Sequence, residues 1–209
     1  MKDQNEPVYP NFDQKCGGIK TISSQLLHLH QLAWQPARFA HPLWLTKAGL
    51  KAQSYCYGNS PALDAALNRY LIHVRNFPLE PLPAVLTDQQ KSDLLLESRL
   101  KKLCMALGLI SLKCVEYLRI AHYRQAFHPT LNETDMRQLL GIGCPSQSAI
   151  SLTPDLLPKI ARQLGYGIFH SIESGNLIWR AFSILLPPLP RAIHFPQARL
   201  WLGRLERLL

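Results

Sequence analysis

Between Leu96 and Ala121, apolar side chains recur at spacings of three and four residues, and this stripe constrains the fold more than any other feature of the sequence. Its members are Leu96, Leu100, Leu103, Leu107, Ile110, Cys114, Leu118 and Ala121. Residues three and four apart share one face of an α-helix, so the stripe predicts a helix that buries this face. Read as one continuous helix, residues 88–124 would extend about 55 Å. We expect the core to include Leu103, Leu107, Ile110 and Leu118.

Local signals mark the start of this helix and a weak point inside it. Thr87, followed three residues later by Gln90, fits a capping box at the N-terminus. Gly108 lies in the helix interior, where glycine costs about 1 kcal/mol relative to alanine. Gly108 therefore marks either a break into two antiparallel helices or a place where another helix packs closely.

Start and stop signals predict further helices along the chain. Serine, threonine and asparagine caps, prolines in first turns and a glycine after the last turn supply these signals. The expected helices run from Ser23 or Ser24 to Ala33, from Pro42 to Leu50, from Pro61 to Val74, from Thr130 or Asn132 to Leu140 with Gly141 after it, from Thr153 or later to Ile172, from Ser174 to Leu186, and from Gln197 to Leu209. We predict an all-α, irregular multi-helix globular fold, with a minor β element at most, near residues 53–58.

Prolines and glycines suggest the domain organisation. Residues 1–22 contain two prolines and the pair Gly17-Gly18, which break any periodicity, so we expect a flexible N-terminal segment. Residues 23–209 then form a single helical domain. Three prolines within residues 76–86 make this stretch an extended connector and the candidate internal boundary.

Charge and cysteine content limit the compartment and the partners. The net charge is +9, but the basic residues are dispersed, which is typical of a solvated surface that steers acidic partners weakly. The five cysteines are widely spaced and contain no CxxC pair, so a reducing compartment is expected. The N-terminus does not fit a secretory signal, and the longest apolar run is too short to span a bilayer. We therefore expect a cytoplasmic protein.

No pattern for catalysis, a cofactor or a metal ion stands out. There is no GxxxxGK[ST] loop, and the GYG sequence at Gly165 does not follow a strand. His28 and His30 are two residues apart, so on a helix they point to different faces, and no acidic or cysteine cluster completes a metal site. We expect no catalytic residue, no cofactor and no metal ligand. A Cys–His enzyme, whose partners would meet only in space, stays the third interpretation.

Two segments are candidates for a partner interface. Residues 35–45 (QPARFAHPLWL) place large apolar side chains around two prolines, and residues 119–124 form a basic, aromatic helix end. Aromatic residues among basic ones can stack nucleic acid bases, but cations also stabilise helix C-termini, and arginine and tyrosine are common in protein interfaces. The candidate interface residues are Pro36, Arg38, His41, Trp44, Arg119, Tyr123 and Arg124.

Three segments taken together resemble a known family. They are residues 35–45, the stretch LCMALGLISLKCVEYLRIAHYRQAF at 103–127, and ARQLGYGIFHSI at 161–172 followed by WRAFSILLPP at 179–188. In order and chain length they resemble the SctK-type sorting-platform proteins of type III secretion injectisomes. The resemblance covers most of residues 35–190 and carries no catalytic signature.

The resemblance implies a cytoplasmic adaptor at the cytoplasmic face of the inner membrane. Such a protein links the cytoplasmic domain of the SctD-type inner-membrane ring protein to the SctQ-type pod protein. Through the pod it joins the SctL-type stator and the SctN-type ATPase, and it hydrolyses nothing itself. The alternative function is a basic, helical nucleic-acid-binding regulator, which would bind generic DNA with a steep dependence on salt.

Overall fold

The computed structural model describes residues 23–143, 152–172, 176–188 and 192–209, and these ranges contain helices and loops but no strand. The α-helices are α1 (Ser24–Trp34), α2 (Pro42–Lys47), α3 (Pro61–Val74), α4 (Asp88–Leu95), α5 (Leu100–Ser111), α6 (Ala121–Phe127), α7 (Glu133–Gly141), α8 (Leu157–Ile172), α9 (Leu177–Phe182) and α10 (Ala198–Leu208). Short 3-10 helices are η1 (Pro36–Arg38), η2 (Ala52–Ser54), η3 (Leu96–Arg99), η4 (Val115–Arg119) and η6 (Ser183–Leu185). The all-α prediction is confirmed.

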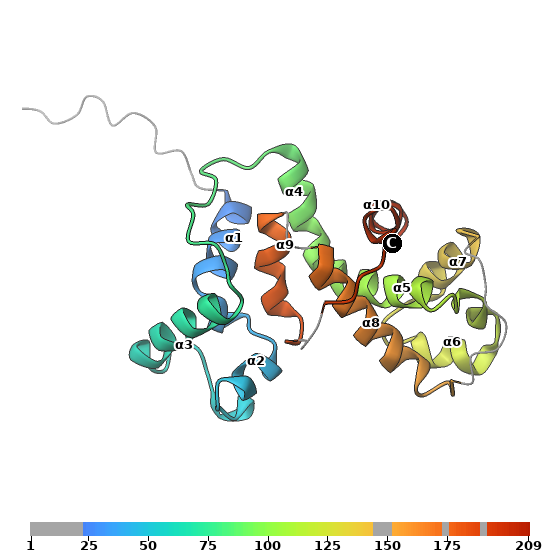
Figure 1. The fold of residues 1–209 in the computed structure, drawn as a ribbon, viewed down its shortest axis with the longest axis horizontal. Coiled ribbons are helices and arrows are strands. Elements are labelled where there is room, and N and C mark those ends of the chain that lie inside the picture. The colour runs from blue at the N-terminus through green and yellow to red at the C-terminus, as the bar shows by residue number, and fades with distance from the viewer. Residues whose placement is uncertain (1–22, 144–151, 173–175, 189–191) are drawn as a thin grey trace, which may run out of the picture.

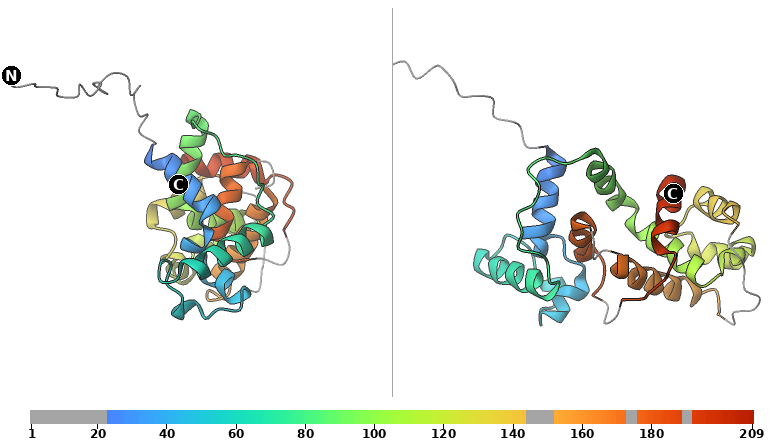
Figure 2. Two further views of the ribbon diagram at one scale, coloured as in Figure 1. Left: turned by 90° about the vertical axis from the view of Figure 1, so that its left-hand side faces the viewer. Right: turned by 45° about the horizontal axis from the view of Figure 1, so that its top comes forward.

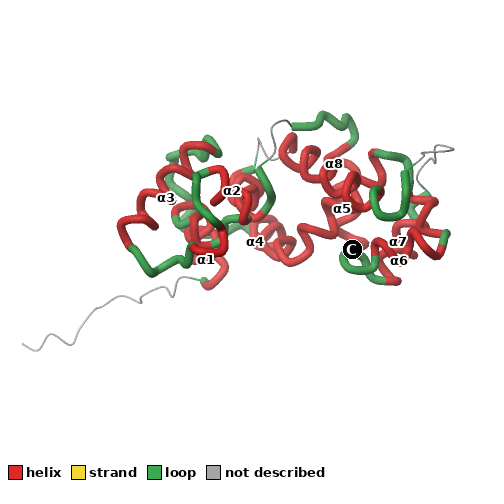
Figure 3. Tube along the Cα trace, turned by 90° about the horizontal axis from the view of Figure 1, so that it is seen from below, coloured by secondary structure: helices red, strands yellow, loops and turns green. Residues whose placement is uncertain are grey.

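The helices gather in two groups, which Figure 1 shows side by side. The first group contains α1, α2, α3 and α9, and the second contains α5, α6, α7, α8 and α10; Figure 3 shows the same separation from below. The chain first passes from one group to the other through α4 and η3. Because α9 follows α8 in sequence but packs on α1 and α4, the chain returns to the first group late, and the groups are not consecutive domains. Figure 2 shows the C-terminus on α10, in the second group.

The second group is built around α5 and α8, which contact each other more extensively than any other pair of elements. At their crossing, a Cβ on Gly108 would overlap the backbone carbonyl of Ala161, and a Cβ on Gly165 would overlap the carbonyl of Cys104. The two glycines therefore allow the helix backbones to touch. Of the two interpretations of Gly108, close packing by another helix is correct. The alternative of a helix break is wrong, because Gly108 lies within α5.

Residues 88–124 do not form one continuous helix, because α4, η3, α5, η4 and α6 divide this stretch. The end of α5 has a clear local cause. Lys113 takes a left-handed conformation (φ 55°), its N–H donates to the carbonyl of Ile110, and the N–H of Cys114 donates to the carbonyl of Leu109. This pattern is a Schellman motif, which ends a helix and satisfies its last carbonyls.

The stripe residues nevertheless lie in the core as predicted. Leu103, Leu107 and Leu118 are fully buried and Ile110 is 4% exposed. Cys104 and Cys114 are also fully buried, as expected of small core residues. The 3-10 segments change the direction of the chain while keeping the apolar side chains turned inward.

Several predicted helix ends are confirmed, and others differ from the observed ends. Ser23, Ser60, Thr87 and Asn132 accept the expected capping hydrogen bonds, and Thr87 forms its capping box with Gln90. The predicted helix from Pro42 ends earlier, at Lys47, and α7 continues through Gly141. The predicted helix from Ser174 is α9 followed by η6. Residues 53–58 contain no β element, since Ala52–Ser54 is a 3-10 turn and Gly58 has a positive φ of 98°.

Residues 76–86 connect α3 to α4 and lack regular structure. The side chains of Phe77, Leu82 and Leu86 are buried, and the Phe77 ring meets the Trp34 ring edge-on at 5.8 Å. The internal boundary at this stretch stays a prediction, and the expected flexible segment 1–22 lies outside the described residues. Within the described ranges, no helix combines the length and apolar character needed to cross a membrane.

Candidate partner-binding surface

The candidate interface at residues 36–44 is partly buried inside the first helix group. Pro36 is buried, and Trp44 is only 5% exposed. The indole Nε1 of Trp44 donates to the carbonyl of Leu186 at 2.8 Å, and the N–H of His41 donates to the carbonyl of Ile184 at 2.9 Å. Trp44 and His41 therefore hold this segment against the residues of η6 and its C-terminal end, while Pro36 lies in η1, which packs on α1 and α3. Arg38 is exposed and can meet a partner.

The candidate cluster at residues 119–124 makes several contacts within the protein. Arg119 forms an ion pair with Glu116 at 2.7 Å, and the Nε of Arg124 lies 3.8 Å from Glu133. The hydroxyl of Tyr123 donates to the carbonyl of Leu152 at 2.7 Å. The Arg119 side chain is still 68% exposed. The cluster thus faces solvent, but carboxylates already neutralise part of its charge.

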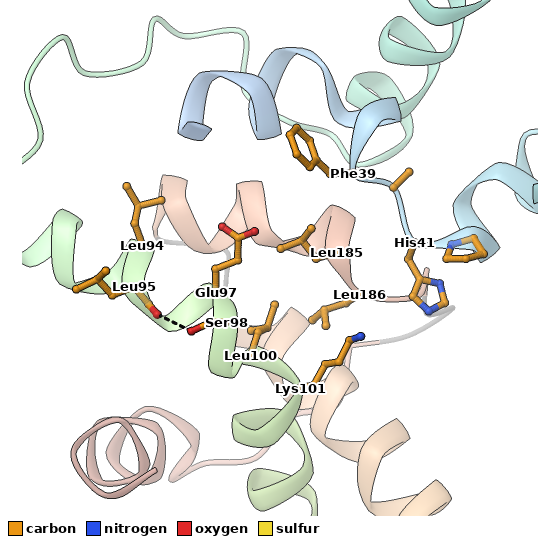
Figure 4. A pocket seen from close by; sticks show the side chains of 12 residues that line it. Phe39, His41, Leu94, Leu95, Glu97, Ser98, Leu100, Lys101, Leu185 and Leu186 are labelled. Atoms are coloured by element: carbon orange, nitrogen blue, oxygen red, sulfur yellow. Dashed lines mark hydrogen bonds between the residues drawn. The ribbon is translucent and has the colours of Figure 1, made fainter. Parts of the chain in front are cut away.

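The structure also contains a site that sequence reasoning missed, at the junction of the two helix groups. Its first part is a cavity of about 690 Å³. The cavity is lined by residues 39–42, 94, 95, 97, 98, 100, 101, 185 and 186. Figure 4 shows apolar side chains on several sides of this cavity, among them Phe39, Leu94, Leu100 and Leu186. The polar side chains among its labelled residues include Glu97, Lys101 and His41.

A second cavity, of about 580 Å³, adjoins the first and shares His41 and Lys101 with it. One face of α8 lines it with Lys159, Arg162, Gln163 and Tyr166, which are spaced three, four and seven residues from Lys159. Leu43, Thr130, Pro187 and Pro188 complete the lining. We call the two cavities together the junction groove.

The charge of the junction groove is unbalanced at one end. The second cavity is lined by Lys101, Lys159 and Arg162 but by no carboxylate. In the part of the chain that the structure describes, none of these three cations forms an ion pair. Burial, and after it the charge of Lys101, lowers the pKa of His41 below its ordinary value. In the first cavity, Glu97 is held by His28, whose Nε2 lies 2.6 Å from the carboxylate.

Only part of this site could be seen in the sequence. The spacing of Lys159, Arg162 and Tyr166 places them on one face of a helix, but a solvated polar face has the same pattern. The groove depends on Leu43 and Pro187 from the other helix group, which only the tertiary structure brings to α8. Of the predicted interface residues, His41 alone lines the groove.

Of the two histidines that the sequence places close together, His28 is engaged within the protein. His28 pairs with Glu97 and meets the ring of Phe39 edge-on at 5.3 Å. Among the described residues, no three histidine, cysteine or acidic side chains gather closely enough to hold a metal ion.

A family model described as a type III secretion system subunit matches residues 27–188, which takes in most of both helix groups. No curated protein and no solved structure matches the chain.

Proposed function

Because the chain belongs to the family of type III secretion system subunits, we propose that it is a non-enzymatic adaptor of the secretion sorting platform. In this role it links the SctD-type inner-membrane ring protein to the SctQ-type pod protein, and through the pod to the SctL-type stator and the SctN-type ATPase. The family match over residues 27–188 carries the proposal, together with the resemblance of residues 35–190 to SctK-type proteins. The proposed location is the cytoplasmic face of the inner membrane, without a span of its own.

Cys104 and Cys114 are buried, whereas Cys56 is exposed, and the two buried thiols are unsuited to act as the nucleophile of a Cys–His enzyme. A reactive cysteine needs an accessible thiolate. Burial raises the pKa of the Cys104 thiol far above its ordinary value and that of Cys114 to about 11, so both thiols stay protonated near neutral pH. Neither fits the nucleophile of a Cys–His enzyme.

The basic cluster at residues 119–124, at the end of η4 and in α6, is our candidate for the surface that steers association with the ring protein. Arg119, Tyr123 and Arg124 lie on it, and Arg38 adds a further exposed cation on the other helix group. Exposed charges are each worth about 0–1 kcal/mol in affinity. Their main effect is on the association rate with a surface of opposite charge.

The test of the adaptor function is pairwise co-purification. The tagged chain is expressed with the cytoplasmic domain of the SctD-type protein, or with the SctQ-type protein, from the same organism. The proposal expects each partner to be retained in stoichiometric amount. If neither is retained while generic DNA binds with a steep salt dependence, the nucleic-acid-binding alternative replaces it.

The steering role has its own test. Arg119→Glu combined with Arg124→Glu should slow association with the ring-protein domain and flatten its salt dependence, with the helical content unchanged. An association rate and salt slope equal to those of the wild type would show that this cluster does not steer the partner.

A further inference from the structure

We propose that the junction groove is the docking site for an acidic segment of a partner protein, with carboxylates at the α8 end and apolar anchors at the α4 end. The proposal deepens the adaptor function and rests on it for the existence of a protein partner. It names the surface and the chemistry of the segment, neither of which follows from family membership.

Cations without an ion pair to any described residue gather at the α8 end of the groove. Lys101, Lys159 and Arg162 converge on the second cavity from α5 and α8, no carboxylate lines that cavity, and none of the three forms an ion pair among the described residues. The neighbouring Lys102 differs, because it pairs with Asp135 at 2.8 Å. Three cations left together in a hollow repel one another, and a bound carboxylate would relieve this repulsion while forming charge-assisted hydrogen bonds.

Apolar side chains line the groove beside these cations and continue into the first cavity. Next to the cations, Leu43, Tyr166 and Pro187 line the second cavity, and the first cavity continues with Phe39, Leu94 and Leu186. Leu43 is 51% exposed and Leu95 is 62% exposed, so both leucine side chains present apolar surface that a partner could cover. Binding sites typically combine such apolar walls with a few polar groups that fix orientation.

The shape and the mixture of groups favour a peptide over the other anionic ligands. A membrane surface presents its head groups on a broad face and cannot follow a groove that enters between two helix groups. Nucleic acid carries charge at every phosphate, so its backbone would face the leucines at the α4 end, where only Lys101 lies nearby. A peptide that combines acidic and apolar side chains can satisfy both ends.

The test measures binding of a defined probe to the full chain. A fluorescein-labelled peptide of glutamate and leucine is titrated with protein and followed by fluorescence anisotropy. A second peptide, with every glutamate replaced by glutamine, tests the requirement for charge. Vesicles of equal parts phosphatidylglycerol and phosphatidylcholine, and a labelled DNA duplex, test the other two anionic ligands.

Two groove variants and one control locate the binding. Lys101→Glu, Lys159→Glu and Arg162→Glu together reverse the groove, and the corresponding triple glutamine variant neutralises it with less risk to folding. Lys51→Glu, Arg69→Glu and Arg137→Glu together make the same change in net charge on exposed cations outside the groove. Circular dichroism confirms that the variants used are folded.

The proposal expects the acidic peptide to bind, the glutamine peptide to bind much more weakly, and the groove variants to lose about tenfold or more in affinity, because three charge-assisted contacts disappear. The control should stay close to the wild type. Equal losses in groove and control variants, or binding of vesicles or DNA but not of the peptide, would overturn it. The adaptor function can fail separately, since a chain that binds the peptide but retains neither secretion protein would contradict only the choice of partners.

Discussion

Gly108 of α5 lies directly against the backbone carbonyl of Ala161 of α8, so closely that there is no room for a Cβ atom. Gly165 repeats this relationship from the other helix, against the carbonyl of Cys104. The two contacts set the distance between the helices that form the centre of the second group. They also set the position of Lys159 and Arg162 relative to Lys101, and therefore the width of the charged end of the junction groove.

Substitution at this crossing should be costly. Gly108→Ala or Gly165→Ala would push a methyl group into rigid backbone, and overpacking of this kind typically costs about 1–3 kcal/mol or more. Gly203 in α10 is the matched control, because a Cβ there meets nothing within 4 Å. Gly203→Ala should stabilise the protein by about 0.5–1 kcal/mol, since alanine favours a helix interior. Urea unfolding measures the stability of all three variants. If Gly108→Ala were as stable as the wild type, the two helices would not be in contact at this position.

The apolar stripe gives a second prediction about stability. Leu107 is fully buried, so Leu107→Ala should lower the free energy of unfolding by about 2–5 kcal/mol. Leu200 in α10 is 55% exposed, and Leu200→Ala should change it by no more than about 0.5 kcal/mol. A melting temperature that stays the same in Leu107→Ala would mean that the stripe faces solvent.

Trp44 should prove to be a core residue and not a partner anchor. Trp44→Phe keeps an aromatic ring but removes the donor to the carbonyl of Leu186, and an unsatisfied buried acceptor costs about 1–3 kcal/mol. We expect chemical denaturation to show this loss, with the affinity of the folded protein for its partners unchanged. If Trp44→Phe instead weakened partner binding and left the stability unchanged, Trp44 would be an interface residue.

Stability should fall in mild acid because of His41. Its pKa is lowered in the folded protein by burial and by Lys101, and its Nδ1 accepts a hydrogen bond from the N–H of Leu43 at 3.3 Å. The unfolded chain therefore takes up the proton first as the pH falls below the ordinary value of 6.5. The stabilising contribution is complete above this pH and decreases below it.

The variant His41→Asn isolates this effect, because asparagine can still cap α2 but does not titrate. Other charged groups lie near His41: Lys101, Lys159 and Arg162 line the same cavity, and Glu97 lines the adjoining one. These groups are present in the wild type and in His41→Asn, so the difference between the two proteins reports on His41. Urea unfolding at pH 7.5 and pH 5.5 should show a smaller acid loss in the variant than in the wild type. His194→Asn, at an exposed histidine, is the control and should behave as the wild type. An unchanged acid loss in His41→Asn would contradict the assignment.

The sequence predicted local structure well where short-range chemistry decides it. Caps at Ser23, Ser60, Thr87 and Asn132 depend on a side chain and the N–H three residues later, so the pattern alone identifies them. The apolar stripe identified the core for the same reason. The end of α5 was missed because the motif there uses a left-handed Lys113, and lysine gives no sign of that conformation.

The candidate site was harder to predict because it depends on tertiary contacts. Pro36 and Trp44 were predicted as partner anchors, but both are buried: Pro36 lies in η1, which packs on α1 and α3, and Trp44 donates to the carbonyl of Leu186, from a segment that returns late in the chain. The same return brings Pro187 and Leu186 to Lys101 and completes the junction groove. A hydrogen bond such as that between Trp44 and Leu186, which are 142 residues apart, leaves no periodic signal in a single sequence.

The most direct test of the account is a bridging experiment with three purified proteins. The cytoplasmic domain of the SctD-type ring protein is fixed to beads, and the SctQ-type pod protein is added with and without this chain. The account predicts that the pod protein is retained in proportion to the chain added and is lost when the chain is omitted. Retention of the pod protein that does not depend on the chain, or no retention when all three are present, would contradict the proposed linking function.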